Sequence, residues 1–166
     1  MIYLIFDLDD TIVIHPPDDK DMYDIKSDPQ LQYLFNNLYY KSYIFTNGTL
    51  GHAHEILDKM KLYSFKKIFA RDTIPFMKPN IKSYEFVQKN ILYGDYNNDK
   101  TNTFIFFDDL LENLQTAKKL GWKTVWIHPN FNQKIYYDFI DLSYPNIYDA
   151  LYKIDNLIKK FIIIIK

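Results

Sequence analysis

The chain has 166 residues, 48% of them hydrophobic and 25% charged, which is enough for one globular domain with a buried core and is not the composition of a disordered chain or coiled coil. The net charge is -1 and Arg71 is the only arginine, which excludes the arginine clusters typical of proteins that bind nucleic acid broadly. Cysteine is absent, so disulfides, thiolate nucleophiles and cysteine-based zinc sites are excluded, and we expect a cytoplasmic location.

Apolar runs and helix-like segments alternate along the chain. Continuous apolar runs typical of buried parallel strands occupy residues 2–6, 42–46, 67–70, 103–107 and 124–127. Apolar residues recur at helical spacing in 29–40, 51–61, 80–92 and 110–120. This alternation predicts a three-layer, Rossmann-like α/β fold, with a mostly parallel sheet of about five strands and helices on both faces.

Nothing in the sequence marks a second domain. No internal repeat, linker or composition break appears, so we expect one domain over residues 1–166, with 12–28 as a short flap and 158–166 as a C-terminal tail. The apolar run at 161–165 is far shorter than the roughly 20 residues that a bilayer span needs. We interpret it as a last turn or strand packed on the body, with a partner-binding tail as the alternative.

Distinctive polar groups follow four of the predicted strands. In strand order they are Asp7, Asp9 and Thr11; Thr46, Asn47 and Gly48; Lys78; and Asp108 and Asp109. Because the carboxyl ends of parallel strands meet at one edge of a sheet, these groups are predicted to share one crevice. Two-residue spacing places the first two carboxylates on one side of the chain, and the last acidic pair can hold a hard divalent cation.

These motifs, in this order, resemble the haloacid dehalogenase-like (HAD-like) superfamily over roughly residues 1–157. Phe6-Asp7-Leu8-Asp9-Asp10-Thr11 looks like motif I, Thr46 like motif II, Lys78 like motif III and Asp108-Asp109 like motif IV. A finer similarity to the pyrimidine 5′-nucleotidase-like branch lies in Phe45-Thr46-Asn47 with His52-Ala53, in Lys78-Pro79, and in Phe107-Asp108-Asp109 followed by Asn113.

The resemblance implies a magnesium-dependent phosphomonoester phosphatase. It makes Asp7 the nucleophile that forms an aspartyl-phosphate and Asp9 the general acid and base, with Thr46 and Lys78 completing the catalytic set. The phosphate would contact Thr11, Asn47 and Gly48. The resemblance assigns Mg²⁺ to Asp7, the main-chain carbonyl of Asp9, and Asp108, with Asp109 a ligand through water or an orienting group. Such oxygen ligands favour magnesium over zinc.

Simpler interpretations exist for each motif taken alone. Asp-x-Asp-x-Thr is often a solvated turn, Lys78-Pro79 a helix entry, Thr11 a turn cap and Asn113 a surface residue. A receiver domain also combines an acidic pair, an Asp, a Thr and a Lys around magnesium, but there the acidic pair comes first along the chain. A non-catalytic phosphate-binding module is the third alternative, and the complete catalytic set counts against it.

The four histidines carry no clear signal. His52 and His54 are two apart on a predicted helix and do not share a face, so we interpret both as non-ligands, with His52 the one that could border the pocket. The roles of His15 and His128 stay open.

The sequence leaves no room for a cap domain over the crevice. Residues 12–28 are fewer than the roughly 25 that a helical hairpin needs, and residues 50–77 are used by one helix, one strand and a loop. We therefore expect an open site for small phosphate esters, nucleoside monophosphates foremost, with a phosphoprotein or a nucleic-acid end as the alternative. Acidic flap residues disfavour nucleic acid: Asp18, Asp19, Asp21 and Asp24. Whether a partner or an oligomer covers the site stays open.

Overall fold

A computed structural model describes residues 1–15, 21–95, 101–132 and 137–163. Along the chain its elements are β1 (Ile2–Phe6), α1 (Pro29–Asn36), β2 (Lys41–Phe45), α2 (Leu50–Met60), β3 (Ile68–Phe69), α3 (Ile81–Gly94), β4 (Thr103–Asp108), α4 (Leu111–Lys119), β5 (Lys123–Ile127), β6 (Leu142–Tyr144), α5 (Ile147–Tyr152) and α6 (Ile154–Ile163). The predicted α/β class is confirmed, and each predicted strand and helix is present, with ends shifted by a few residues.

The strands form one six-stranded sheet in the order β3-β2-β1-β4-β5-β6. Every neighbouring pair is parallel. The chain therefore builds one half of the sheet outward from β1 and then returns to place β4 on the other side of β1. Ligands of open α/β sheets bind beyond the carboxyl ends of the strands, at the point where the strand order reverses. The sheet thus places the expected crevice between β1 and β4.

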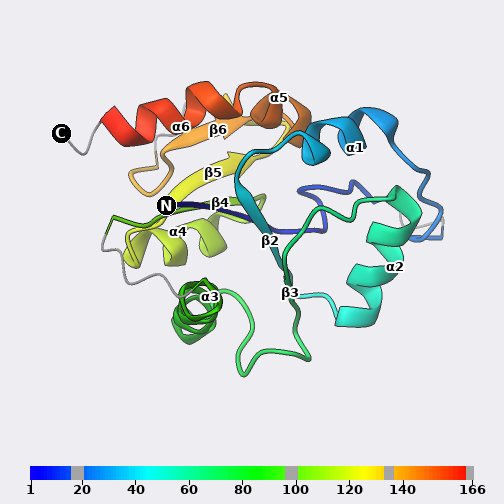
Figure 1. The fold of residues 1–166 in the computed structure, drawn as a ribbon, viewed down its shortest axis with the longest axis horizontal. Coiled ribbons are helices and arrows are strands. Elements are labelled where there is room, and N and C mark those ends of the chain that lie inside the picture. Colours follow the sequence, from blue (N-terminus) through cyan, green and yellow to red (C-terminus); the bar gives the residue numbers. More distant parts are fainter. Residues whose placement is uncertain (16–20, 96–100, 133–136, 164–166) are drawn as a thin grey trace.

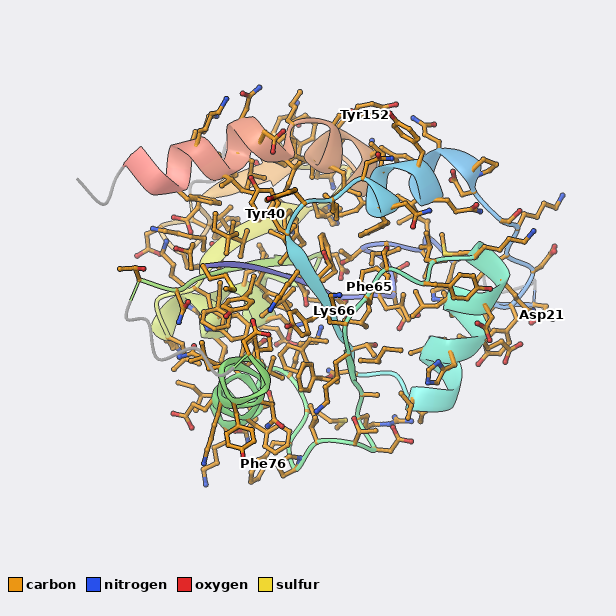
Figure 2. The ribbon with its side chains drawn as sticks, in the orientation of Figure 1. Asp21, Tyr40, Phe65, Lys66, Phe76 and Tyr152 are labelled. Carbon is orange, nitrogen blue, oxygen red and sulfur yellow. The ribbon has the colours of Figure 1, made fainter. Side chains whose placement is uncertain are left out.

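Helices cover both faces of this sheet (Figure 1). Helices α1, α5 and α6 lie over one face, whereas α3 and α4 lie over the other. Strand residues alternate between the layers: in β1, Leu4 and Phe6 pack with the first group of helices, and Tyr3 and Ile5 pack with the second. Side chains fill both layers, whereas Phe76 and Tyr152 lie at the periphery (Figure 2). The three-layer arrangement fixes β1 in the centre of the core.

The segment expected to be a C-terminal tail belongs largely to a helix. Residues 158–163 lie in α6, and Leu157, Ile158 and Phe161 are buried in the core under it. Packing on the body agrees with the favoured interpretation, but the local structure is a helix rather than a turn or strand. The rest of the predicted tail, 164–166, lies outside the described residues. No helix in the described part of the chain is long and apolar enough to cross a bilayer.

The predicted flap contains no helix in its described parts, 12–15 and 21–28. Ile12 and Val13 are buried, and a single parallel bridge pairs Asp9 with Val13. Residues 16–20, which include Asp18 and Asp19, lie outside the described residues. Between α2 and α3 the chain forms only β3 and loops. Neither described interval therefore holds the helices of a cap domain.

Replacing two glycines with alanine tests the backbone geometry, because the two substitutions should change the free energy of unfolding in opposite directions. Gly121 ends α4 in the left-handed region at φ +78°, where a side chain costs about 1–2 kcal/mol. Gly51 lies inside α2, where a Cβ would meet nothing within 4 Å and alanine favours the helix by up to about 1 kcal/mol. Urea unfolding should therefore show Gly121→Ala destabilised and Gly51→Ala slightly stabilised. Equal effects would contradict the assigned backbone conformations.

Candidate active site

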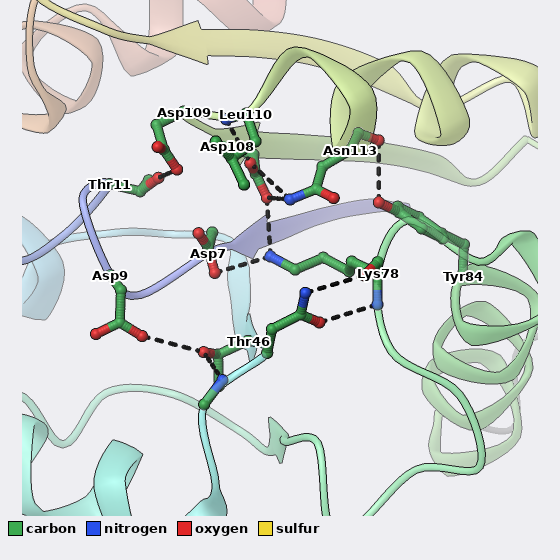
Figure 3. Close-up of polar contacts among 12 residues, drawn as sticks. Asp7, Asp9, Thr11, Thr46, Lys78, Tyr84, Asp108, Asp109, Leu110 and Asn113 are labelled. Atoms are coloured by element: carbon green, nitrogen blue, oxygen red, sulfur yellow. Dashed lines mark hydrogen bonds and ion pairs between the residues drawn. The ribbon is translucent and has the colours of Figure 1, made fainter.

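A buried lysine joins the ends of β1 and β4. Lys78 Nζ lies 2.8 Å from Asp7 Oδ1 and 2.8 Å from Asp108 Oδ2 (Figure 3). Asp7 follows β1 directly, Asp108 is the last residue of β4, and all three side chains are buried. Residues 30 or more positions apart thus meet at the reversal of strand order, as the sequence predicts.

Negative charge exceeds positive charge in this cluster. Burial raises the pKa of the Asp7 carboxyl to about 8; Lys78 opposes the shift and Asp108 adds to it. Burial and the charge of Asp108 likewise raise the pKa of Asp109 to about 6. Burial alone lowers the pKa of Lys78, but Asp108 and Asp7 raise it above its ordinary value. One ammonium therefore faces three carboxyls, and a further positive charge would be stabilised here.

The three carboxyls fit a hard divalent cation. Asp7, Asp108 and Asp109 each offer an oxygen atom, and these atoms lie within 4.8 Å of one another. Magnesium takes oxygen ligands at about 2.0–2.1 Å and usually keeps water in its remaining positions. The Asp9 side chain is not part of this group.

Asp108 is held by its own network. Asn113 Nδ2 donates to both Asp108 oxygens at 3.0 Å, and the Leu110 N–H donates to Oδ1 at 2.8 Å. The Tyr84 hydroxyl donates to the main-chain carbonyl of Asn113 at 3.0 Å. Asn113 is 1% exposed, so it is a buried support for Asp108 and not a surface residue. Such contacts fix the direction in which a carboxylate presents its oxygens.

The loop after β2 is tied to the loop that carries Lys78. Asn47 Nδ2 donates to the Lys78 carbonyl, and Asn47 Oδ1 accepts from the Lys78 N–H, both at 2.9 Å. The Asn47 side chain is thereby committed to the backbone of Lys78, so its predicted contact with phosphate would have to use its main chain. These two hydrogen bonds fix the position of the Lys78 backbone, from which its side chain reaches Asp7.

Gly48 brings backbone close to the carboxylates. Its N–H donates to Thr46 Oγ1 at 2.9 Å, and Thr46 Oγ1 lies 3.4 Å from Asp9 Oδ2. A Cβ on Gly48 would stand 2.7 Å from His52 Cδ2 and 3.4 Å from Asp9 Oδ2. Only glycine allows this approach without displacing a neighbour.

Thr11 lies on the acidic side of the site. Its hydroxyl is buried and donates to Asp109 Oδ1 over 3.4 Å, which is a long hydrogen bond. The contact places Thr11 beside a carboxyl group, although the sequence assigned it to the phosphate. The main-chain carbonyl of Asp109 also accepts a 2.8 Å hydrogen bond from Trp126 Nε1.

Two histidines converge on Asp9. His15 Nε2 lies 2.5 Å and His52 Nε2 2.7 Å from Asp9 Oδ1. Burial alone raises the pKa of Asp9, but hydrogen bonds from His15 and His52 outweigh it and lower the pKa below its ordinary value. His52 therefore does border the site, and His15, to which the sequence gave no role, lies in it as well.

The position of His52 in the first turn of α2 explains why its side chain reaches the site, and the sequence contained the signal needed to predict this. Thr49 caps α2, and helical side chains lean toward the N-terminus, so a residue in the first turn of α2 points back at the crevice. One turn of sequence separates His52 from Thr49, whereas His54 faces outward and is exposed. No comparable pattern marks His15. His128 stacks on Trp126, with 4.9 Å between the ring centroids, and does not belong to either histidine contact of Asp9.

Comparison with solved structures assigns the fold. YfnB from Bacillus subtilis, described as a HAD-hydrolase bound to magnesium, matches at 23% identity over 74% of this chain, with a TM-score of 0.60. L-2-haloacid dehalogenase from Xanthobacter autotrophicus with chloropropionic acid covalently bound matches at 15% over 81%, with 0.59. A HAD phosphatase from Thermococcus onnurineus matches at 20% over 79%, with 0.58. The chain therefore has the HAD-like fold.

These proteins are larger than this chain. The matched part is 53% of YfnB, 63% of the dehalogenase and 57% of the phosphatase. No family model and no curated protein matches the sequence. The fold is shared with hydrolases of two chemistries, and the choice between them has to come from the site.

Proposed function

We propose that the protein is a magnesium-dependent phosphomonoester phosphatase that acts through an aspartyl-phosphate on Asp7. The observation that carries the proposal is the pairing of two unlike carboxyls at the end of β1. Asp7 is buried against Lys78, whereas Asp9 is half-buried and faces a separate hydrogen-bonding group. Two carboxyls in different surroundings can divide the roles of nucleophile and general acid. In the free protein burial raises the pKa of Asp7 and the histidines lower that of Asp9, so the reaction requires bound Mg²⁺ to lower the first and the negative charge of the phosphate to raise the second.

The residues divide the reaction between them. Lys78 contacts Asp7 Oδ1, which leaves Oδ2 to attack phosphorus in line with the leaving oxygen. The P–O bond to the leaving group breaks as the Asp7–phosphorus bond forms, and Asp9 gives its proton to the departing oxygen. Asp9, now ionised, takes a proton from water as that water attacks the acyl phosphate. Phosphate leaves and Asp7 is restored.

Charge at the phosphoryl group is balanced by the groups around it. Magnesium held by Asp7, Asp108 and the carbonyl of Asp9 would offset the repulsion between carboxylates and a phosphate dianion. Lys78 adds a fixed ammonium, buried at 4% exposure, where electrostatic interactions are stronger than in water. Thr46 and the backbone around Gly48 stand on the Asp9 side of Asp7, in place to contact phosphoryl oxygens (Figure 3).

Asp9 favours phosphatase over dehalogenase chemistry. A halide leaves a carbon atom as a stable anion and needs no proton, whereas an alkoxide leaving group gains from a nearby acid. The acidic group of Asp7, Asp108 and Asp109, with Lys78 beside it, likewise supports a divalent cation and a phosphate dianion. Both features serve a phosphoester and neither is required for removal of a halide.

Small phosphomonoesters are the proposed substrates, with nucleoside monophosphates foremost. Met77 and Leu110, the chain neighbours of Lys78 and Asp109, are 46% and 47% exposed. Apolar side chains next to the phosphate site can pack against a base or another apolar leaving group. The open site also admits a phosphoprotein or an end-phosphorylated nucleic acid, and the acidic Asp21 and Asp24 disfavour the latter.

Removal of magnesium should stop the reaction reversibly. EDTA is expected to abolish hydrolysis of p-nitrophenyl phosphate, and added Mg²⁺ to restore it. Asp108→Asn and Asp109→Asn should each raise the Mg²⁺ concentration required for half-maximal activity, because each removes a carboxylate from the cation site. Exposed Glu112→Gln, on the first turn of α4, serves as the matched control. Full activity in EDTA would contradict the proposal.

The substrate class is tested by comparing kcat/KM across compounds. The panel should include nucleoside monophosphates, sugar phosphates, phosphopeptides, end-phosphorylated oligonucleotides and 2-chloropropionate. We expect the best values for nucleoside monophosphates. A more than hundredfold preference for either macromolecular class would reverse the ranking, and halide release from 2-chloropropionate without phosphatase activity would replace the function.

A further inference from the structure

We propose that Asp9, His15 and His52 form a second metal site, selective for a divalent transition-metal ion such as Zn²⁺, and that its occupation inhibits the phosphatase. The inference rests on the proposed function for its effect on activity, but the site itself does not depend on that function. Each of the three residues offers a ligand atom within 4.8 Å of the others, and Asp9 Oδ1 lies 2.5 Å from His15 Nε2 and 2.7 Å from His52 Nε2.

The hydrogen bond of His15 shows that a positive charge is needed among these atoms. His15 Nδ1 lies 3.2 Å from the Met22 carbonyl, and a carbonyl only accepts, so Nδ1 carries a hydrogen. In the neutral ring, Nε2 then presents a lone pair to a carboxylate oxygen 2.5 Å away. Two electron-rich atoms at this distance require a proton or a metal ion between them.

His52 is oriented in the same way. Its Nδ1 lies 3.0 Å from the Tyr23 hydroxyl, which can accept a hydrogen bond and leave Nε2 free to face Asp9. Tyr23 is itself held by Lys59, whose Nζ donates to the Tyr23 carbonyl at 2.6 Å. An imidazole that offers one nitrogen to a common point while the other is bonded to an oxygen is the usual arrangement of a metal-binding histidine.

The donor set selects against magnesium. Imidazole nitrogen is a preferred ligand of zinc, cobalt, nickel and copper, whereas Mg²⁺ prefers oxygen. In tetrahedral sites with bonds of about 2.0–2.2 Å the donor atoms stand roughly 3.4 Å apart. The present separations of 2.5 and 2.7 Å would therefore have to widen by less than about 1 Å. Three protein ligands leave one position for water.

Occupation of this site blocks the proposed role of Asp9. A carboxylate oxygen bound to a metal ion can neither deliver a proton to the leaving oxygen nor accept one from water. The site is also separate from the group formed by Asp7, Asp108 and Asp109, so the two ions can be told apart by mutation. Magnesium would activate at one group and a transition metal would inhibit at the other.

Binding is measured directly, without relying on turnover. The full chain, kept in millimolar Mg²⁺, is titrated with Co²⁺ while its visible absorption is recorded, and with Zn²⁺ by calorimetry. We expect one site per chain with a cobalt spectrum typical of low coordination number. His15→Gln and His52→Gln should each weaken binding at least about 100-fold, because even the loss of a supporting contact costs 10–100-fold. His54→Gln, exposed on the same helix, should bind as the unmodified protein does.

Asp108→Asn distinguishes the two groups. It should leave Co²⁺ and Zn²⁺ binding unchanged while weakening the response to Mg²⁺. Zinc binding that is lost in Asp108→Asn but kept in His15→Gln and His52→Gln would contradict the proposed site. The absence of any binding would contradict it as well, because a proton alone would then lie among the three side chains. If the site binds cobalt but no substrate is turned over, the proposed function fails and the metal site stands.

Inhibition is the second measurement. Zn²⁺ is expected to lower p-nitrophenyl phosphate hydrolysis at saturating Mg²⁺, with a midpoint that matches its calorimetric affinity. Removal of either imidazole should move that midpoint to higher zinc by the same factor as the affinity, while the His54→Gln midpoint stays in place. A midpoint unaffected by both histidine variants would place inhibition at another site and overturn the regulatory part of the proposal.

Discussion

Replacing Asp7 with asparagine is expected to lower kcat by more than about a thousandfold while leaving the fold intact. The amide has nearly the shape of the carboxylate but cannot act as the nucleophile. It also removes one carboxyl from a buried group in which the carboxyls outnumber Lys78, so stability should not fall by more than about 1–3 kcal/mol. Steady-state hydrolysis and circular dichroism of the same preparation make the measurement.

Asp10→Asn is the matched control for this variant. Asp10 lies three residues further along the same loop, is exposed, and has φ 56°, a conformation that asparagine also accepts. Its activity should stay close to that of the unmodified protein. Asp7→Asn activity within tenfold of that value would contradict the assignment of Asp7 as the nucleophile. A phosphoryl group trapped on any other residue would contradict it independently.

Trp122→Ala should give the largest loss of stability. The Trp122 ring is 1% exposed and lies 5.4 Å from the ring of Tyr84 and 5.5 Å from that of Phe104, in the layer beneath α3 and α4. Its Nε1 donates to Gln88 Oε1 at 2.6 Å. Deleting a buried tryptophan costs about 3–5 kcal/mol, which for a domain of this size lowers Tm by roughly 10 °C. Urea unfolding followed by circular dichroism measures the loss.

Two companion variants separate the causes of that loss. Tyr39→Ala, at 95% exposure, should change the free energy of unfolding by no more than about 0.5 kcal/mol. Gln88→Ala removes only the acceptor of the indole N–H and should cost about 1–2 kcal/mol. A loss below about 1 kcal/mol in Trp122→Ala would show that this layer is not packed as described.

Strand positions could be predicted because buried parallel strands are apolar on both faces. In β4 an unbroken apolar run, Phe104–Phe107, leads to Asp108, and β1, β2 and β5 likewise contain continuous apolar segments. The same property concealed β6, whose three residues are all half-buried and form no such run. Helix α1 ends at Asn36 rather than residue 40 because the Asn37 side chain bonds the Tyr33 carbonyl, and Leu38 packs from the loop beyond.

Within the site, groups at strand ends could be predicted and their partners could not. Asp7, Lys78 and Asp108 lie where the strand-end rule places them. The histidine pair at Asp9 depends on how the loop after β1 folds against the first turn of α2, which is a tertiary contact between residues 37 positions apart. The two hydrogen bonds between Asn47 and Lys78 are also tertiary contacts. They join two loops, and no sequence pattern indicates that these loops meet.

The two outermost strands of the sheet are its shortest, with two residues in β3 and three in β6. An outer strand exposes unpaired N–H and C=O groups, and a long apolar one acts as a template to which another chain can add by β-pairing. Here the long apolar strands are all interior, and the borders are too brief to hold a foreign strand in register. In a chain that is 48% hydrophobic, the short border strands of this sheet therefore work against edge-to-edge aggregation.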